Sequence, residues 1–124
     1  MKNFQKNPTN DIPISNDEIK QIIQENFFQK SMQNIENSDV NLYHLENIFS
    51  DETYYLAMKI VPLLERKVLY LSYVKNARLN DIGRRLKLQK SEIISLRHKG
   101  IQHFKHNLDI LSKVKNLKGV KKNG

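Results

Sequence analysis

The chain of 124 residues has no cysteine and no tryptophan, and it has only three prolines and four glycines. The lack of cysteine excludes a disulfide framework, a cysteine-ligated zinc site and a thiol nucleophile. No apolar run approaches the roughly 20 residues that a membrane-spanning helix needs, and the polar N-terminal residues lack the apolar core of a signal peptide. We therefore expect a cytoplasmic protein that does not bind membranes.

Charge is unevenly distributed along the chain. Residues 1–60 carry five lysines, no arginine and nine acids, a net charge of 5 − 9 = −4. Residues 61–124 carry sixteen lysines and arginines and four acids, a net charge of 16 − 4 = +12. An asymmetry of this kind predicts a polyanionic partner for the basic half.

Apolar residues recur at helical spacing along most of the chain, and no segment alternates in the manner of a strand. The pattern predicts an all-α fold, a small helical bundle with a C-terminal helix-turn-helix preceded by one or two accessory helices. Start signals and breaks place the helices at about 17–32, 40–49, 51–61, 62–74, 79–86 and from 90 onward. The residues expected to face inward are Ile19, Ile22, Ile23, Phe27, Leu64, Val68, Leu71, Val74, Leu79, Ile82, Leu86, Ile93, Leu96, Gly100, Ile101 and Phe104.

These signals divide the chain into four parts. Residues 1–16 have two prolines and little apolar content, and we expect them to be disordered. Residues 17–49 form an accessory helical segment, residues 50–108 the helix-turn-helix domain, and residues 109–124 a basic flexible tail. Ser15 or Asn16 is expected to cap the first helix, and Ser50 the helix that follows it near residue 51.

Residues 79–104 have the layout of a helix-turn-helix, in which a short helix, a tight turn and a longer helix follow one another. Gly83 lies in the middle of the short helix, where glycine costs about 1 kcal/mol relative to alanine. A small residue there would let the second helix cross closely. The same spacing also fits a plain helical hairpin, but the basic charge favours DNA binding.

The outward face of the second helix is the candidate reading surface. Four residues at its start are predicted to contact base edges or a thymine methyl group: Lys90, Ser91, Ile94 and Ser95. Five basic residues are predicted to contact phosphates, which fixes register without reading sequence: Arg84, Arg85, Arg97, His98 and Lys99. Three roles are open for Glu92, namely repulsion of phosphate, pairing with a neighbouring arginine, or acceptance of a hydrogen bond from cytosine.

Three segments resemble region 4 of bacterial sigma factors, in the same order and with the same gaps. Residues 62–73 (PLLERKVLYLSY) resemble the motif LPxxERxVLxLRY, and residues 79–88 (LNDIGRRLKL) resemble LxEIGRRLGV. Residues 90–101 (KSEIISLRHKGI) resemble the recognition helix of that family and its following KALxxL. The similarity covers about residues 52–106 of the chain.

The resemblance implies a sequence-specific transcription regulator on the bacterial nucleoid. Region 4 reads the promoter −35 element in the major groove, and it docks on the flap tip of the RNA polymerase β subunit. By position, Lys90, Ser91, Ile94 and Ser95 match its base-reading sites, while Arg84 and Lys99 match sites near the phosphates. The flap-binding surface would lie within residues 52–75, where four apolar residues remain outside the predicted core stripes: Tyr54, Leu56, Leu63 and Tyr70. Ordinary packing is the alternative for these four.

The chain departs from the family at several positions. Lys87 stands where the turn usually has glycine, and a lysine in the left-handed conformation costs roughly 1 kcal/mol. Gln89 replaces the usual serine or threonine cap, a loss of about 0.5–2 kcal/mol. Ile94 and Ser95 replace longer polar residues, so the consensus −35 sequence is not expected. The segment before the similarity is too short for region 2, so we do not expect a complete conventional sigma factor.

Other functions remain open. One is a protein-interaction module that binds RNA polymerase or another regulator without specific DNA binding. Another is a helix-turn-helix of the LuxR type, which shares the E-R-x-V-L opening but continues with a different pattern.

An enzyme is not expected, and neither is a metal, a cofactor or a small-molecule substrate. His103 and His106 lie at i and i+3, with His98 before them, but no acidic partner pattern completes a metal site. We expect these histidines to lie on the surface and to help phosphate contacts.

Overall fold

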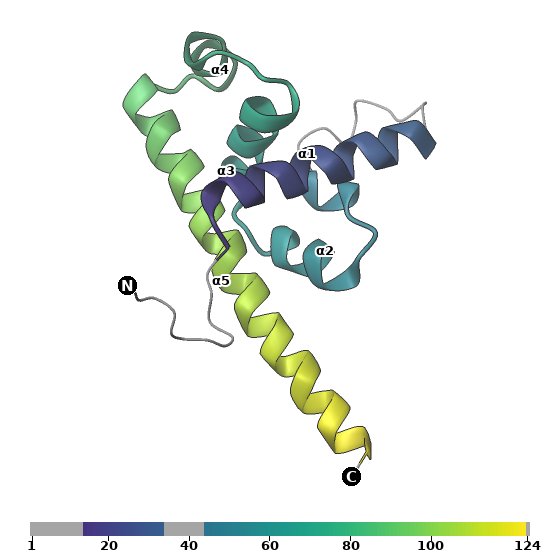
Figure 1. Ribbon diagram of the computed structural model, residues 1–124. Coiled ribbons are helices and arrows are strands. Elements are labelled where there is room, and N and C mark those ends of the chain that lie inside the picture. The colour runs from purple at the N-terminus through teal and green to yellow at the C-terminus, as the bar shows by residue number, and fades with distance from the viewer. Residues whose placement is uncertain (1–13, 34–43, 124) are drawn as a thin grey trace, which may run out of the picture.

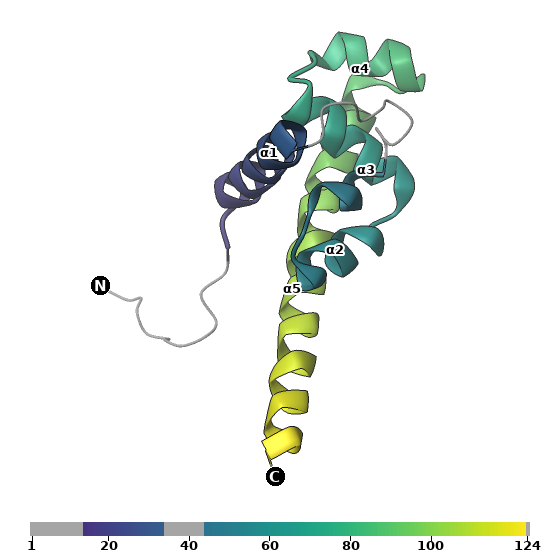
Figure 2. The same ribbon diagram turned by 90° about the vertical axis from the view of Figure 1, so that its right-hand side faces the viewer.

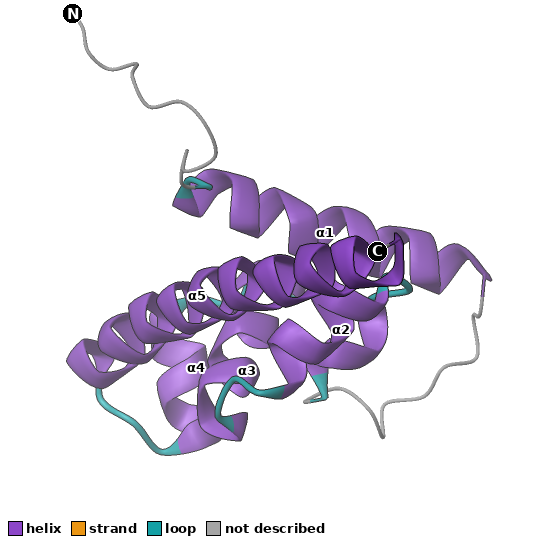
Figure 3. Ribbon diagram, turned by 90° about the horizontal axis from the view of Figure 1, so that it is seen from below, coloured by secondary structure: helices purple, strands orange, loops and turns teal. Residues whose placement is uncertain are grey.

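The computed structural model of the chain describes residues 14–33 and 44–123. Within these ranges all regular structure is helical (Figure 3), which confirms the predicted all-α class and small bundle. The elements are α1 (Asn16–Gln33), the 3-10 helix η3 (Leu45–Ile48), α2 (Glu52–Lys59), α3 (Leu63–Leu69), the π-helix η4 (Tyr70–Val74), α4 (Leu79–Leu86) and α5 (Lys90–Asn123).

The long helix α5 is the element against which α1, α2, α3 and α4 pack (Figures 1 and 2). Its buried side carries the predicted residues Ile93, Ile101 and Phe104, and also Leu108. The Phe104 ring stacks on Phe49 with centroids 5.7 Å apart, and it meets Tyr54 edge to face at 6.3 Å. Offset and edge-to-face pairs of this kind add to the stabilisation that burial alone provides.

Helix α1 begins at a reciprocal capping box. The backbone N–H of Glu18 donates to Ser15 Oγ at 3.1 Å, and the N–H of Ser15 donates to Glu18 Oε1 at 2.8 Å. Ser15 is therefore the cap. As predicted, the apolar stripe of α1 faces the bundle: Ile19 and Ile23 are fully buried, and Ile22 and Phe27 are half-buried.

The segment before residue 50 shares the core of the rest of the chain. Leu45, Ile48 and Phe49 are buried in the same cluster as the residues of α1, α3 and α5. The helix predicted over 40–49 is represented by the four residues of η3, and residues 34–43 lie outside the described residues. Residues 1–13 of the predicted disordered segment also lie outside them.

The corner between α2 and α3 differs from the prediction in two details. Asp51, not Ser50, caps α2, because the Tyr54 N–H donates to Asp51 Oδ1 at 3.0 Å. Leu64 was predicted to face the core but is exposed, since the inward positions of this segment belong to Glu65, Val68 and Leu69. The buried position in the first turn of α3 is thus taken by Glu65, whereas the spacing of the apolar residues predicts that Leu64 is buried there.

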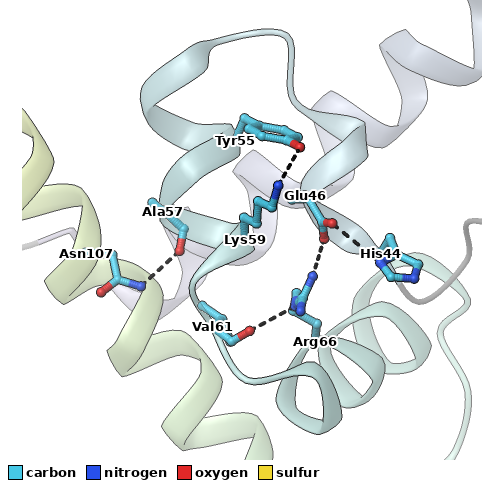
Figure 4. A network of polar contacts seen from close by, with 8 residues as sticks. All are labelled: His44, Glu46, Tyr55, Ala57, Lys59, Val61, Arg66 and Asn107. Atoms are coloured by element: carbon cyan, nitrogen blue, oxygen red, sulfur yellow. Dashed lines mark hydrogen bonds and ion pairs between the residues drawn. The ribbon is translucent and has the colours of Figure 1, made fainter.

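A buried ion pair joins η3 to α3. The Arg66 guanidinium pairs with the Glu46 carboxylate, and its Nε donates to the Val61 carbonyl at 2.9 Å (Figure 4). Nearby, Asn107 Nδ2 of α5 donates to the Ala57 carbonyl at 2.9 Å. These contacts satisfy polar groups that would be costly to bury alone, and they fix the α2–α3 corner against both η3 and α5.

A second buried carboxylate lies between α3 and α5. Glu65 Oε1 is 2.6 Å from His103 Nδ1. One helical turn earlier on α5, a Cβ added to Gly100 would lie 3.0 Å from Leu69 Cδ1 and 3.4 Å from Glu65 Cβ. The absence of a side chain at Gly100 thus lets α5 approach α3 closely.

Helix α5 continues to Asn123, through the segment for which the sequence predicts a flexible tail from residue 109. Leu108 is buried and Leu111 is half-buried against the core, and Lys113 pairs with Asp109 at 3.2 Å over one helical turn. These contacts favour the helix beyond residue 108. Its C-terminal part projects away from the bundle (Figures 1 and 2).

The Arg66–Glu46 pair supports a stability prediction. Arg66→Met removes the guanidinium from the buried Glu46 carboxylate and leaves it the exposed His44 ring, whose Nδ1 lies 3.5 Å away. We expect the free energy of unfolding to fall by about 3–5 kcal/mol. Lys59→Met on the exposed side of α2 is the matched control, with a change within about 0.5 kcal/mol. Urea unfolding followed by circular dichroism measures both. Equal stabilities of the two variants would contradict the structural role of the pair.

Candidate nucleic-acid interface

The turn between α4 and α5 has the geometry that the sequence predicts. Lys87 ends α4 in the left-handed conformation, with φ 60° and ψ 49°, and the Leu88 N–H donates back to the Gly83 carbonyl at 3.0 Å. A Cβ added to Gly83 would lie only 2.7 Å from the Leu88 carbonyl oxygen, whereas Ile93 Cδ1 of α5 would be 3.6 Å away. Glycine is therefore required mainly by the turn, and only secondarily by the crossing of the second helix.

The first turn of α5 is closed by Glu92. The Gln89 backbone N–H donates to Glu92 Oε1 at 2.8 Å, and the Ile93 N–H donates to the Gln89 carbonyl at 3.0 Å. A carboxylate near a helix N-terminus also interacts favourably with the helix dipole. Glu92 thus has a role in starting the helix, which the three roles considered from sequence do not include, and it offsets part of the loss from a glutamine at the cap.

The four predicted base-reading residues lie together on the first two turns of α5. Lys90, Ser91, Ile94 and Ser95 are all exposed, while their neighbour Ile93 is fully buried beneath α4. Ile94 is an aliphatic side chain left in solvent, with 47% of its surface exposed. This end of α5 lies beside α4, far from the projecting C-terminal part (Figure 1).

The five predicted phosphate contacts separate into two groups. Arg84, Arg85, His98 and Lys99 are exposed, and the Arg84 guanidinium pairs with Asp81 on the surface of α4. Arg97 is half-buried and does not share their exposure.

Arg97 lies toward Tyr73 at the end of η4. Burial raises the pKa of the Tyr73 hydroxyl, the Arg97 charge lowers it, and the Asp17 carboxylate of α1 raises it. The Tyr73 carbonyl accepts from Gln24 Nε2 at 2.9 Å, and Lys20 Nζ lies 5.9 Å from the centre of its ring. The Arg97 charge therefore acts on Tyr73, at the junction between α1 and η4.

Three further exposed cations border α4, and they are not among the residues predicted for the site. Arg78 is the N-terminal cap residue of α4, Lys87 is its C-terminal cap residue, and Lys75 precedes it by four residues. The signal that could have identified them is the position of basic residues at the helix boundaries. Cations at both ends of α4 enlarge the basic surface around the start of α5.

The four apolar residues considered for polymerase binding divide evenly. Tyr70 is only 3% exposed and packs edge to face on Phe27, and Tyr54 is half-buried between Phe49 and Phe104, so both belong to the core. Ordinary packing is correct for these two.

Leu56 and Leu63 are exposed, and so are two residues that the sequence analysis did not include, Ile60 and Leu64. Ile60 has 60% of its surface in solvent. We call these four residues at the α2–α3 junction the apolar corner.

The histidines of α5 do not act alike. His98, His103 and His106 are all exposed, as expected, but His103 Nδ1 also lies 2.6 Å from the buried Glu65 carboxylate. Among the described residues, no cluster of histidine and acidic side chains could hold a metal ion. In the same part of the chain, no helix combines the length and the apolar character of a membrane span.

Comparisons with protein-family models, with curated protein sequences and with solved structures find no match to this chain.

The turn supports a second stability prediction. Lys87→Gly relieves the left-handed strain at this position, and we expect the free energy of unfolding to rise by about 1 kcal/mol. Lys75→Gly is the control, because Lys75 has φ −89° and gains no such relief; we expect it to lose stability by about 0.5–1 kcal/mol. Thermal or urea unfolding compares the two. A loss of stability in Lys87→Gly would show that the turn carries no strain.

Proposed function

We propose that the chain is a sequence-specific DNA-binding transcription regulator that reads a promoter element of the −35 type through the first turns of α5. In a bacterial cell it would act in the cytoplasm on nucleoid DNA. The observation that carries the proposal is the exposure of Lys90, Ser91, Ile94 and Ser95 at the start of a helix that α4 holds in place. An α-helix fits the major groove of B-form DNA, where each base pair presents its own pattern of donors and acceptors.

The chemistry of these side chains suits base edges. The Lys90 ammonium can donate to the acceptor atoms of guanine, and the Ser91 and Ser95 hydroxyls can donate or accept on several bases. Ile94 offers an apolar contact for a thymine methyl group. Because Ile93 is buried on the opposite side of the same turn, the four side chains are held on a fixed backbone.

Charge around the reading surface favours a phosphate backbone. Residues 79–99 carry six lysines and arginines against two acids, Asp81 and Glu92. Both acids are engaged within the protein, Asp81 with Arg84 and Glu92 with the backbone of Gln89. The remaining cations would neutralise phosphates and release counterions, which is the main source of sequence-independent affinity for DNA.

Salt dependence tests whether DNA is the partner. With about five phosphates neutralised, the affinity for a mixed-sequence duplex should fall about 500-fold between about 50 and 200 mM salt. Fluorescence anisotropy of a labelled duplex measures this loss. A response that is flat over this range would rule out the electrostatic contact that the proposal requires.

Alanine variants test base reading. Selection from a randomised duplex pool should enrich one sequence with the unaltered chain, and Lys90→Ala or Ser95→Ala should relax the preference at one or two base pairs, each worth about 1–3 kcal/mol. Lys113→Ala removes the same charge from the far part of α5 and should leave the preference unchanged. Uniform weakening on all sequences would instead assign Lys90 and Ser95 to phosphate.

The apolar corner supports a second candidate function, the binding of RNA polymerase or another regulator through protein contacts. Leu56, Ile60, Leu63 and Leu64 are exposed within nine residues of one another. Neighbouring exposed aliphatic side chains are typical of protein-binding surfaces. The corner is formed by α2 and α3, and the proposed reading surface is formed by α4 and the start of α5, so one chain could bind both partners.

Retention on an immobilised polymerase β flap distinguishes the two functions. If the corner binds the flap, Ile60→Asp should abolish retention of the full chain and leave DNA affinity intact. Ile94→Asp is the control, because it places the same substitution on the proposed reading surface and should affect DNA alone. Retention that survives Ile60→Asp would exclude the corner as the polymerase contact.

A further inference from the structure

Helix α1 presents an exposed apolar pair on its outer face. Phe28 and Met32 are one helical turn apart and have 59% and 65% of their surfaces in solvent. Glu25 precedes Phe28 on the same side, and with Asn26, Phe28 and Gln29 it lines a surface hollow. This outer face of α1 is therefore apolar, hollowed and acidic.

No lysine of α1 shares this face. Lys20 lies over the Tyr73 ring at the junction with η4, and Lys30 is half-buried. Glu25 is held only by a long contact of 3.5 Å from the Gln21 amide, which leaves its carboxylate in solvent.

The projecting part of α5, which we call the arm (residues 105–123), presents the complementary chemistry. Ile110 and Val114 are one helical turn apart and have 45% and 44% of their surfaces exposed. Lys113 lies beside them in solvent and pairs with Asp109 at 3.2 Å. The arm carries six lysines and one acid. It thus combines an aliphatic pair with positive charge, as α1 combines an apolar pair with negative charge.

The two faces belong to helices that diverge within one chain. Asn16 at the start of α1 contacts Lys105 at the start of the arm, at 3.3 Å. From that point α1 and the arm run in different directions (Figures 1 and 2). Each face is therefore open to another molecule.

We propose that two copies of the chain form a twofold dimer in which the outer face of α1 of each copy packs on the arm of the other. Phe28 and Met32 would cover Ile110 and Val114, with Glu25 facing Lys113. Twofold symmetry repeats the contact, so that both faces of both copies are covered. A polyanion such as nucleic acid would engage the lysines of the arm but not its aliphatic pair, which is why a protein face fits better.

The dimer is independent of the proposed DNA contact. Val114 and Lys90 are 24 residues apart on α5, or about 36 Å along the helix axis. The dimer contact therefore leaves the start of α5 in both copies exposed.

Crosslinking between copies tests the proposal. Because the chain has no cysteine of its own, a maleimide reagent reacts only with the cysteines that are introduced. A tagged Phe28→Cys chain mixed with an untagged Ile110→Cys chain should give a crosslinked heterodimer with a short bismaleimide. The control mixture contains a tagged Glu52→Cys chain, altered at an exposed position of α2, in place of the Phe28→Cys chain. It should give no crosslinked heterodimer. Equal crosslinking in both mixtures, or none in either, would overturn the proposal.

A charge exchange provides a second readout. Sedimentation equilibrium of the full chain should show a dimer that Glu25→Lys or Lys113→Glu weakens about tenfold, because each exposed pair occurs twice. The double variant Glu25→Lys with Lys113→Glu should recover most of the affinity. A chain that stays monomeric at about 100 μM, or a dimer that tolerates both Phe28→Asp and Ile110→Asp, would overturn the proposal.

Discussion

The burial of one side of α5 is the constraint on which the rest of the structure depends. Phe104 is fully buried against Phe49 and Tyr54, Gly100 admits the side chain of Leu69, and Ile93 lies beneath α4. The same helix thus contacts α1, α2, α3 and α4. Because its buried side is held at several points, its opposite side at the N-terminal end is presented in a fixed orientation. Rigid presentation of a few polar side chains is what base reading requires.

The charge asymmetry acquires a structural explanation. In the front half, Glu18 and Asp51 cap helices, and Glu46 pairs with Arg66. In the back half, the buried acid Glu65 is engaged with His103. Many acids therefore have local structural partners, while around α4 the basic residues outnumber the acids and Arg84 pairs with Asp81. The change of sign near residue 60 does not coincide with a boundary in the packing, since α1 and η3 bury their apolar residues in the common core.

Local patterns predicted the α4–turn–α5 segment better than they predicted the α2–α3 corner before it. The spacing of Leu79, Ile82 and Leu86 and the left-handed Lys87 place α4, the turn and the start of α5 correctly, because short-range sterics decide them. The inward position of Glu65 could not be read, because its partner His103 lies 38 residues further along the chain. For Tyr70 the sequence left packing and polymerase contact open; the π-helix η4 adds a residue to its turn and brings Tyr70, Leu71 and Ser72 all into the interior.

The measurement that tests the central claim most directly is the mapping of backbone amide shifts by NMR when a mixed-sequence duplex of about 20 base pairs is added. The account predicts that the largest changes fall on residues 78–99, at both ends of α4 and on the first turns of α5, while α1 and residues 105–114 change little. Changes concentrated on α1 or on residues 105–114, with the start of α5 unaffected, would contradict it.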